Sequence, residues 1–144
     1  MKTYLLWLPA VVIAVSTAMY RPVKEALTEK PSDKSISVAI YKGNSYAADI
    51  YSNTSAKLHI TIEKVNGNCR TQVWSQTLDA KMLKEYPSAE QALAETVMVP
   101  KVFSKENLQV TYTITYDSDG SELQMQSAEI VSGNTKETKL SISI

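Results

Sequence analysis

Apolar and polar residues alternate along several stretches of the chain, and this period of two is typical of β-strands with one buried face. The longest stretch runs from 108 to 116, where apolar residues are separated by single polar ones: Leu108, Val110, Tyr112, Ile114 and Tyr116. Shorter alternating stretches lie at 36–41, 46–51, 58–62 and 140–144. We predict a strand at each of these places.

The turn after the longest stretch specifies a hairpin. Asp119 and Gly120 form the dipeptide that a two-residue type I′ turn favours. The implied register pairs apolar with apolar and polar with polar residues: Tyr116 with Leu123, Ile114 with Met125, Thr115 with Gln124, and Thr113 with Gln126. A slip of one residue would reverse every pair, so this register is strongly specified.

Two further hairpins are expected. Asn66 and Gly67 predict a turn that pairs Ile60 with Val73, His59 with Trp74, and the opposite charges of Glu63 and Arg70. The segment 43–45 predicts a turn between the alternating stretches 36–41 and 46–51.

The segment 77–96 does not alternate in the same way. Leu78, Met82 and Leu83 have helical spacing, and Ser88 with Gln91 forms a capping pattern. We therefore expect a short helical excursion around 78–95. A strand near 96–99 should follow and end at Pro100.

About 7–8 strands with frequent turn signals predict an all-β fold, an antiparallel β-sandwich, with a small antiparallel β-barrel as the alternative. The order of strands over 35–131 resembles immunoglobulin-like and fibronectin type III-like sandwiches. The resemblance implies that fold. The paired cysteines and the Trp between them that mark antibody domains are absent, so no binding residues are carried over with it.

The N-terminal residues have the layout of a secretory signal peptide. An apolar run at 5–15 follows Lys2 and closes on Ser16 and Ala18, the small residues that a signal peptidase requires. We expect a signal peptide at 1–18, a flexible linker at 19–34 and a β-sandwich domain at 35–144. Retention of the run as an uncleaved anchor is the alternative. The signal peptide predicts that the protein is exported to the periplasm, the cell envelope or the extracellular space.

Charge excludes some classes of partner. The chain has 15 basic and 15 acidic residues, and removal of Lys2 with the signal peptide leaves a net charge of about −1. Such a balance gives no electrostatic basis for binding nucleic acid or an anionic membrane. After signal cleavage we expect no membrane span, because no other apolar run is long enough.

The residues that catalysis would require are few. Cys69 is the only cysteine, and we expect it in the core, with a free thiol or an intermolecular disulfide as alternatives. His59 is the only histidine, and alternation puts it on the opposite face from Cys69, so a Cys–His couple is disfavoured. One His and one Cys do not fill a zinc site. We expect no metal, no cofactor and no enzymatic activity, and a hydrolase that uses carboxylates is the least favoured alternative.

Trp74 is the candidate binding residue. The predicted register places it on a polar face with the other candidates, namely His59, Glu63, Arg70 and Gln72. An exposed Trp beside charged groups stacks on a sugar ring or anchors a protein partner. The interpretation that we favour is nevertheless that Leu78, Met82, Leu83 or Leu93 of the irregular segment folds back and covers it.

These observations predict an exported, non-enzymatic β-sandwich that binds a protein or a glycan. The alternative is a small-molecule carrier in which Tyr46, Tyr112, Tyr116 and Met125 line a cavity.

Overall fold

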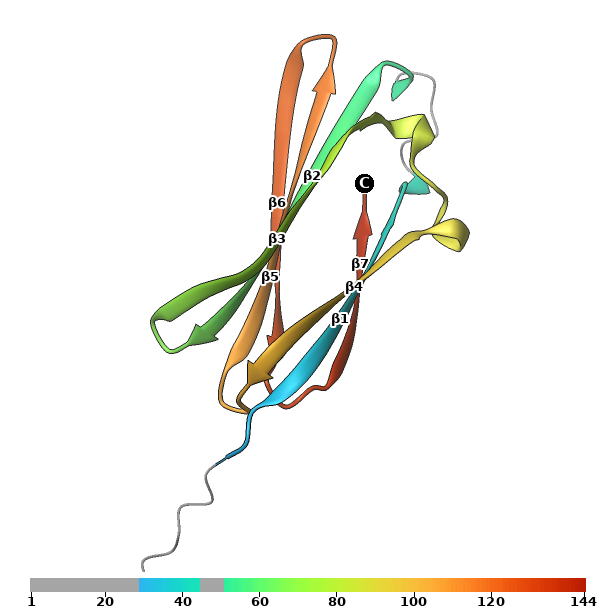
Figure 1. The fold of residues 1–144 in the computed structure, drawn as a ribbon. Helices are drawn as coiled ribbons and strands as arrows, with labels where there is room; N and C mark the ends of the chain where they lie inside the picture. Colours follow the sequence, from blue (N-terminus) through green and yellow to red (C-terminus); the bar gives the residue numbers. More distant parts are fainter. Residues whose placement is uncertain (1–28, 45–50) are drawn as a thin grey trace, which may run out of the picture.

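The computed structural model describes residues 29–44 and 51–144, and it is built of strands with two single-turn 3₁₀ helices. The described residues form two separate sheets, one of three strands and one of four (Figure 1). The three-stranded sheet consists of β1 (Ser32–Tyr41), β4 (Leu93–Val102) and β7 (Glu137–Ser143). The four-stranded sheet consists of β2 (Thr54–Asn66), β3 (Cys69–Met82), β5 (Asn107–Ser118) and β6 (Ser121–Ser132). The predicted all-β character is confirmed.

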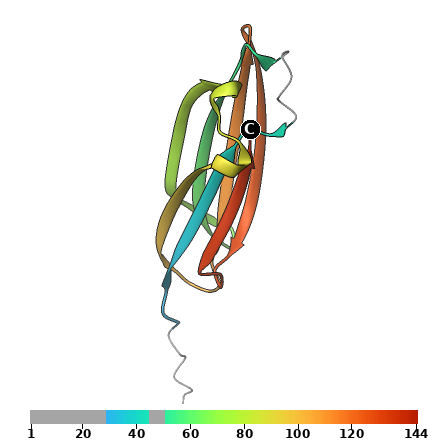
Figure 2. The same cartoon turned by 90° about the vertical axis from the view of Figure 1, so that its right-hand side faces the viewer.

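The two sheets form two layers, which Figures 1 and 2 show from perpendicular directions. In the smaller sheet the order is β4-β1-β7, and β1 runs antiparallel to β4 and parallel to β7. In the larger sheet the order is β3-β2-β5-β6, and every pair is antiparallel. No ladder joins the two sheets within the described residues.

A single hydrophobic core takes alternate residues from both sheets. Its fully buried members include Ile36 and Val38 of β1, Leu58, Ile60 and Ile62 of β2, Leu108 and Val110 of β5, and Ile142 of β7. Burial of each such side chain stabilises the fold by roughly 1.5–3 kcal/mol relative to exposure. The period-two pattern of the sequence therefore identifies the core-facing rows of β1, β2, β5 and β7.

The β5–β6 hairpin has the predicted register. Tyr116 pairs with Leu123, Ile114 with Met125, and the predicted polar pairs also form. Asp119 and Gly120 have φ angles of 51° and 81°, as a type I′ turn requires. The Asp117 carboxylate accepts the Gly120 N–H at 3.1 Å, which fixes the turn further.

The register predicted for the β2–β3 hairpin is wrong. Asn66 pairs with Cys69, so the two central residues of the turn are Gly67 and Asn68. Gly67 has φ 57° and no positive φ occurs at Asn68, the pattern of a type II′ turn rather than type I′. A β-bulge further along leaves Val73 without a partner, and the ladder has a second irregularity between Ala56 and Leu58.

The predicted hairpin between 36–41 and 46–51 is also wrong. Both edges of β1 are occupied, one by β4 and the other by β7, so no edge remains for a neighbouring hairpin strand. Residues 45–50 lie outside the described residues. The parallel partner is favoured because it brings the apolar row of Leu140 and Ile142 to the core.

The segment 77–96 contains two short 3₁₀ turns, as the expected helical excursion requires, but its first and last parts are strand. β3 continues to Met82, and Leu78 pairs with Leu58 across the ladder. Two 3₁₀ turns follow, at Leu83–Glu85 and Ala89–Gln91, and Ser88 makes no side-chain cap hydrogen bond. β4 does not end at Pro100: the ladder to β1 is irregular there, and a proline is tolerated on an edge strand.

At the N-terminal end, β1 begins at Ser32, three residues before the expected domain boundary at 35. The expected signal peptide at 1–18 and most of the expected linker lie outside the described residues. No helix within 29–44 or 51–144 has the length and apolar character needed to cross a bilayer.

Candidate functional site

Four of the five candidate binding residues lie on the outer face of the four-stranded sheet. His59 pairs with Thr77, and its Nδ1 lies 2.8 Å from the Thr77 Oγ1. Glu63 pairs with Gln72, and its Oε2 lies 3.8 Å from Nη1 of Arg70. The Arg70 side chain is 57% exposed, so this ion pair contributes little to stability. The structure thus brings Glu63, Arg70 and Gln72 together, and His59 lies four residues away along β2 on the same face.

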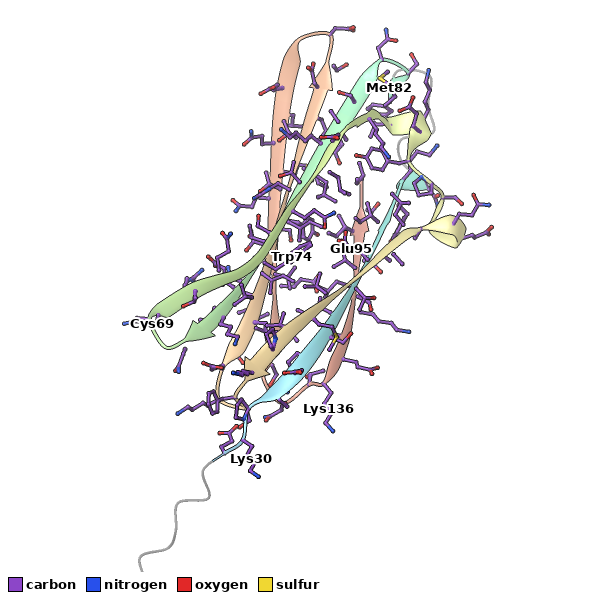
Figure 3. The ribbon with its side chains drawn as sticks, in the orientation of Figure 1. Lys30, Cys69, Trp74, Met82, Glu95 and Lys136 are labelled. Atoms are coloured by element: carbon purple, nitrogen blue, oxygen red, sulfur yellow. The ribbon has the colours of Figure 1, made fainter. Side chains whose placement is uncertain are left out.

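Trp74 does not share that face. It pairs with Ile62, which is fully buried, and its side chain packs against the hydrophobic core. The physical reason is the bulge at Val73, since one extra residue in β3 reverses the face of every residue that follows. Figure 3 shows Trp74 along β3 near the middle of the four-stranded sheet.

Cys69 is exposed, which corrects the expectation that it lies in the core. It is the first residue after the β2–β3 turn, and Figure 3 shows it at the tip of that hairpin. The first five residues of β3, 69–73, are all exposed. Cys69 pairs with Asn66 at the turn end of the β2–β3 ladder, seven residues along β2 from His59, so the two side chains form no couple.

The described residues contain no group of three His, Cys, Asp or Glu side chains that could hold a metal ion. The hydrogen bond found for His59 joins it to a threonine hydroxyl on an exposed sheet face. If the threonine hydroxyl were a nucleophile and His59 its base, catalysis would also require a third group that orients the histidine ring.

An apolar site lies instead at the turn end of the β5–β6 hairpin. Leu123 and Met125 point to the same side of the sheet as Tyr116 and Ile114, their partners in the ladder. The two β5 residues are buried, whereas Leu123 is 62% and Met125 50% exposed. The three-stranded layer does not reach this far: both views show the β5–β6 turn extending past the end of β7 (Figures 1 and 2).

These residues border a groove, which we call the β5–β6 groove, with a volume of about 440 Å³. Its walls are formed by Tyr51, Thr54, Tyr116, Ser118, Ser121, Glu122, Leu123 and Met125. The Thr54 hydroxyl donates to the Ser118 hydroxyl at 3.3 Å on one wall, so the groove combines apolar side chains with a few hydroxyl groups. This composition is typical of a binding site.

The sequence only partly indicated this groove. Two of the four residues expected to line a cavity, Tyr116 and Met125, border this open groove instead. Tyr112 packs against the core instead, and Tyr46 lies outside the described residues. Leu123 was expected to pair with Tyr116, but alternation alone did not show that its inner side is uncovered.

Comparisons with protein-family models, with curated proteins and with solved structures find no match for this chain.

Proposed function

We propose that this chain is an exported, non-enzymatic binding module with an immunoglobulin-like β-sandwich fold, and that it binds a protein at the β5–β6 groove. Two layers of three and four strands around a common core support this fold. The apolar run at 5–15 supports export.

The observation that carries the proposal is the exposure of Leu123 and Met125. The core-facing apolar residues of β2 and β5 are buried, apart from the half-buried Tyr112, yet these two are exposed beside an open groove. Contiguous apolar surface on a folded domain marks an interaction site, since its exposure to water is unfavourable. A partner that covers these side chains removes that cost.

A protein partner is favoured over a glycan. Sugar rings are recognised by stacking on exposed aromatic faces, and Trp74 packs against the core. Beside Tyr51 and the buried Tyr116, the groove offers the exposed aliphatic and thioether side chains of Leu123 and Met125, and flexible methionines adapt to varied partner side chains.

The test is site-specific photo-crosslinking of the exported chain in its own cells. A photoreactive residue replaces Leu123 in one variant and Gln72, on the outer face of β3, in the matched control. We expect a protein adduct from position 123 and none from position 72. Adducts from 72 alone would move the site to the outer face, and adducts from neither position would contradict a binding module.

A small-molecule carrier is the second candidate, and the groove volume of about 440 Å³ favours it specifically. The aromatic and apolar side chains of Tyr51, Tyr116 and Met125 suit an apolar ligand. Native mass spectrometry of the exported chain distinguishes the two: a carrier retains a small molecule that Met125→Glu removes, and a protein-binding module gives the bare chain mass.

A further inference from the structure

The four sheet edges are not equally protected against pairing with another chain. An exposed edge strand presents unpaired N–H and C=O groups, and proteins protect such edges with bulges, prolines, lysines or short length. β4 has Pro100 at an irregular point of its ladder. β3 has two irregular points and carries Arg70 and Lys81. β7 is seven residues long and carries Lys139.

β6 has none of these protective features. Its ladder to β5 runs without any register shift from Ser121 to Ser132. Its sequence contains no proline, glycine, lysine or arginine, and every residue except Val131 is exposed. A strand of 12 residues that is regular and exposed along one edge is a template for an added strand.

The turn determines which backbone groups of β6 are free. Ser118 and Ser121 close a two-residue turn, so they form a hydrogen-bonded pair, and such pairs alternate with non-hydrogen-bonded ones along an antiparallel ladder. We therefore expect free N–H and C=O groups at alternate residues of β6. These are Glu122, Gln124, Gln126, Ala128 and Ile130.

Open space borders both ends of this edge. The β5–β6 groove borders the first part of β6. A second hollow of about 510 Å³ borders the last part, and its walls include Glu129 and Ile130 of β6 with Glu137 and Lys139 of β7. An added strand thus finds apolar side chains at one end and charged ones at the other.

The charges along β6 favour a basic partner. Glu122 and Glu129 are its charged residues, and Glu122 pairs with Asp117, so two carboxylates face each other near the turn. Lys139 is the cation beside Glu129, and Glu137 lines the same hollow. A second copy of this chain paired through β6 would add two more carboxylates and no cation from the strand, which is unfavourable.

We propose that β6 is the docking edge for an extended segment of another protein, which adds as an antiparallel strand. Its apolar residues lie opposite Leu123 and Met125, and its basic residues lie opposite Glu122 and Glu129. This inference rests on the proposed function, because it specifies how the partner occupies the β5–β6 groove. Main-chain hydrogen bonds supply affinity, and the apolar and basic positions supply specificity.

A synthetic peptide tests the edge directly. The peptide acetyl-Val-Lys-Thr-Thr-Thr-Ile-Thr-Val-Lys-amide aligns antiparallel with β6, its first residue opposite Ile130 and its last opposite Glu122. Two isomers carry N-methyl groups, one on residues three, five and seven, whose N–H groups face β6, and the other on residues four, six and eight, whose N–H groups face away. Binding to the exported chain is measured by calorimetry.

We expect the second isomer to bind like the parent and the first to bind about tenfold more weakly or worse, because it loses main-chain hydrogen bonds. Glu129→Lys should weaken binding, and a peptide with glutamate in place of its first lysine should restore it. Glu90→Lys, on an exposed 3₁₀ turn away from β6, is the matched charge control and should leave binding unchanged.

Failure of the parent peptide to bind, or equal affinity of both isomers, would overturn strand addition at β6. A dimer of the chain in sedimentation that Gln126→Pro dissociates would overturn the assigned partner, because the edge would then pair with itself. Neither result removes a crosslink from position 123 in cells, so failure of this inference is distinguishable from failure of the proposed function.

Discussion

Tyr116 and Leu123 face each other across the β5–β6 ladder, but Tyr116 is 7% exposed and Leu123 is 62% exposed. Both side chains point to the core side of the four-stranded sheet. The difference arises because β5 lies between β2 and β6, whereas β6 is the edge strand of the four-stranded sheet and has a neighbouring strand on one side only. Alternation therefore assigns Leu123 to the correct face of β6, although its side chain remains in contact with water.

Leu123→Ser should change the free energy of unfolding by less than about 0.5 kcal/mol, because the side chain is mostly exposed. Leu108→Ala on β5 is the matched control and should cost about 2–5 kcal/mol, since Leu108 is fully buried. Urea denaturation measures both. A loss of several kcal/mol at Leu123 would show that it belongs to the core.

Gly133→Ala should destabilise the fold by about 3 kcal/mol, because the new Cβ would lie 2.0 Å from the carbonyl oxygen of Glu106 and 2.4 Å from that of Phe103. Gly67→Ala is the control: its Cβ would meet nothing within 4 Å, but φ is 57°. That substitution should cost about 1 kcal/mol. Equal losses at the two positions would contradict the close approach at Gly133.

Deletion of Val73 should be tolerated, because Val73 is the bulge residue and its removal leaves Glu63 opposite Gln72 and Ile62 opposite Trp74. Deletion of Ser75 in the same strand should be destabilising, since it reverses the face of the β3 residues on one side of the deletion. A chain that begins at residue 19 retains Trp74 as its sole tryptophan. Its emission should remain blue-shifted after deletion of Val73 and shift to the red after deletion of Ser75. The opposite order would refute the bulge.

Tyr86 links the 3₁₀ turn to β2, and its hydroxyl donates to the Ala56 carbonyl oxygen at 2.9 Å. Burial raises the pKa of this phenol above its ordinary value of 10.0. The protonated form is thus favoured in the folded state. Its contribution to stability is fully present below pH 10 and is lost as the pH rises through the folded pKa.

Tyr86→Phe should therefore lower the free energy of unfolding by about 1 kcal/mol at pH 8. The difference between the wild type and this variant should shrink at pH 11. Urea titrations at the two pH values check this. A difference that grows with pH would contradict a raised pKa.

The sequence predicted those parts of the fold in which local pattern and tertiary contacts agree. The β5–β6 register follows from Asp119, Gly120 and the alternating rows, and all four predicted pairs form. β1 was predicted as a strand, but its partner was not, because strand pairing over long separations depends on how whole sheets bury their faces. Local alternation contains no information on that choice.

The candidate site shows the same limit. Residues two apart in a strand lie on the same face, so Trp74 shares a face with Gln76 and Leu78. Leu78 is apolar and lies opposite Leu58, and this spacing is the feature of the sequence that indicates a core-facing Trp74. The turn dipeptide and the opposite charges of Glu63 and Arg70 indicate the other face for Trp74. Neither feature reveals that β3 contains an extra residue in a bulge. The exposure of Leu123 depends on the position of β6 at the edge of its sheet, and no local pattern encodes the order of strands in a sheet.

Amide hydrogen exchange of β6 tests the central claim most directly. In the free chain the N–H groups of Gln124, Gln126 and Ala128 should exchange quickly, because they face away from β5, and those of Leu123, Met125 and Ser127 should be protected. Addition of the parent peptide should slow exchange at Gln124, Gln126 and Ala128. Unchanged exchange at these three amides when the peptide is bound, with slowing at His59 or Gln72 instead, would contradict the account.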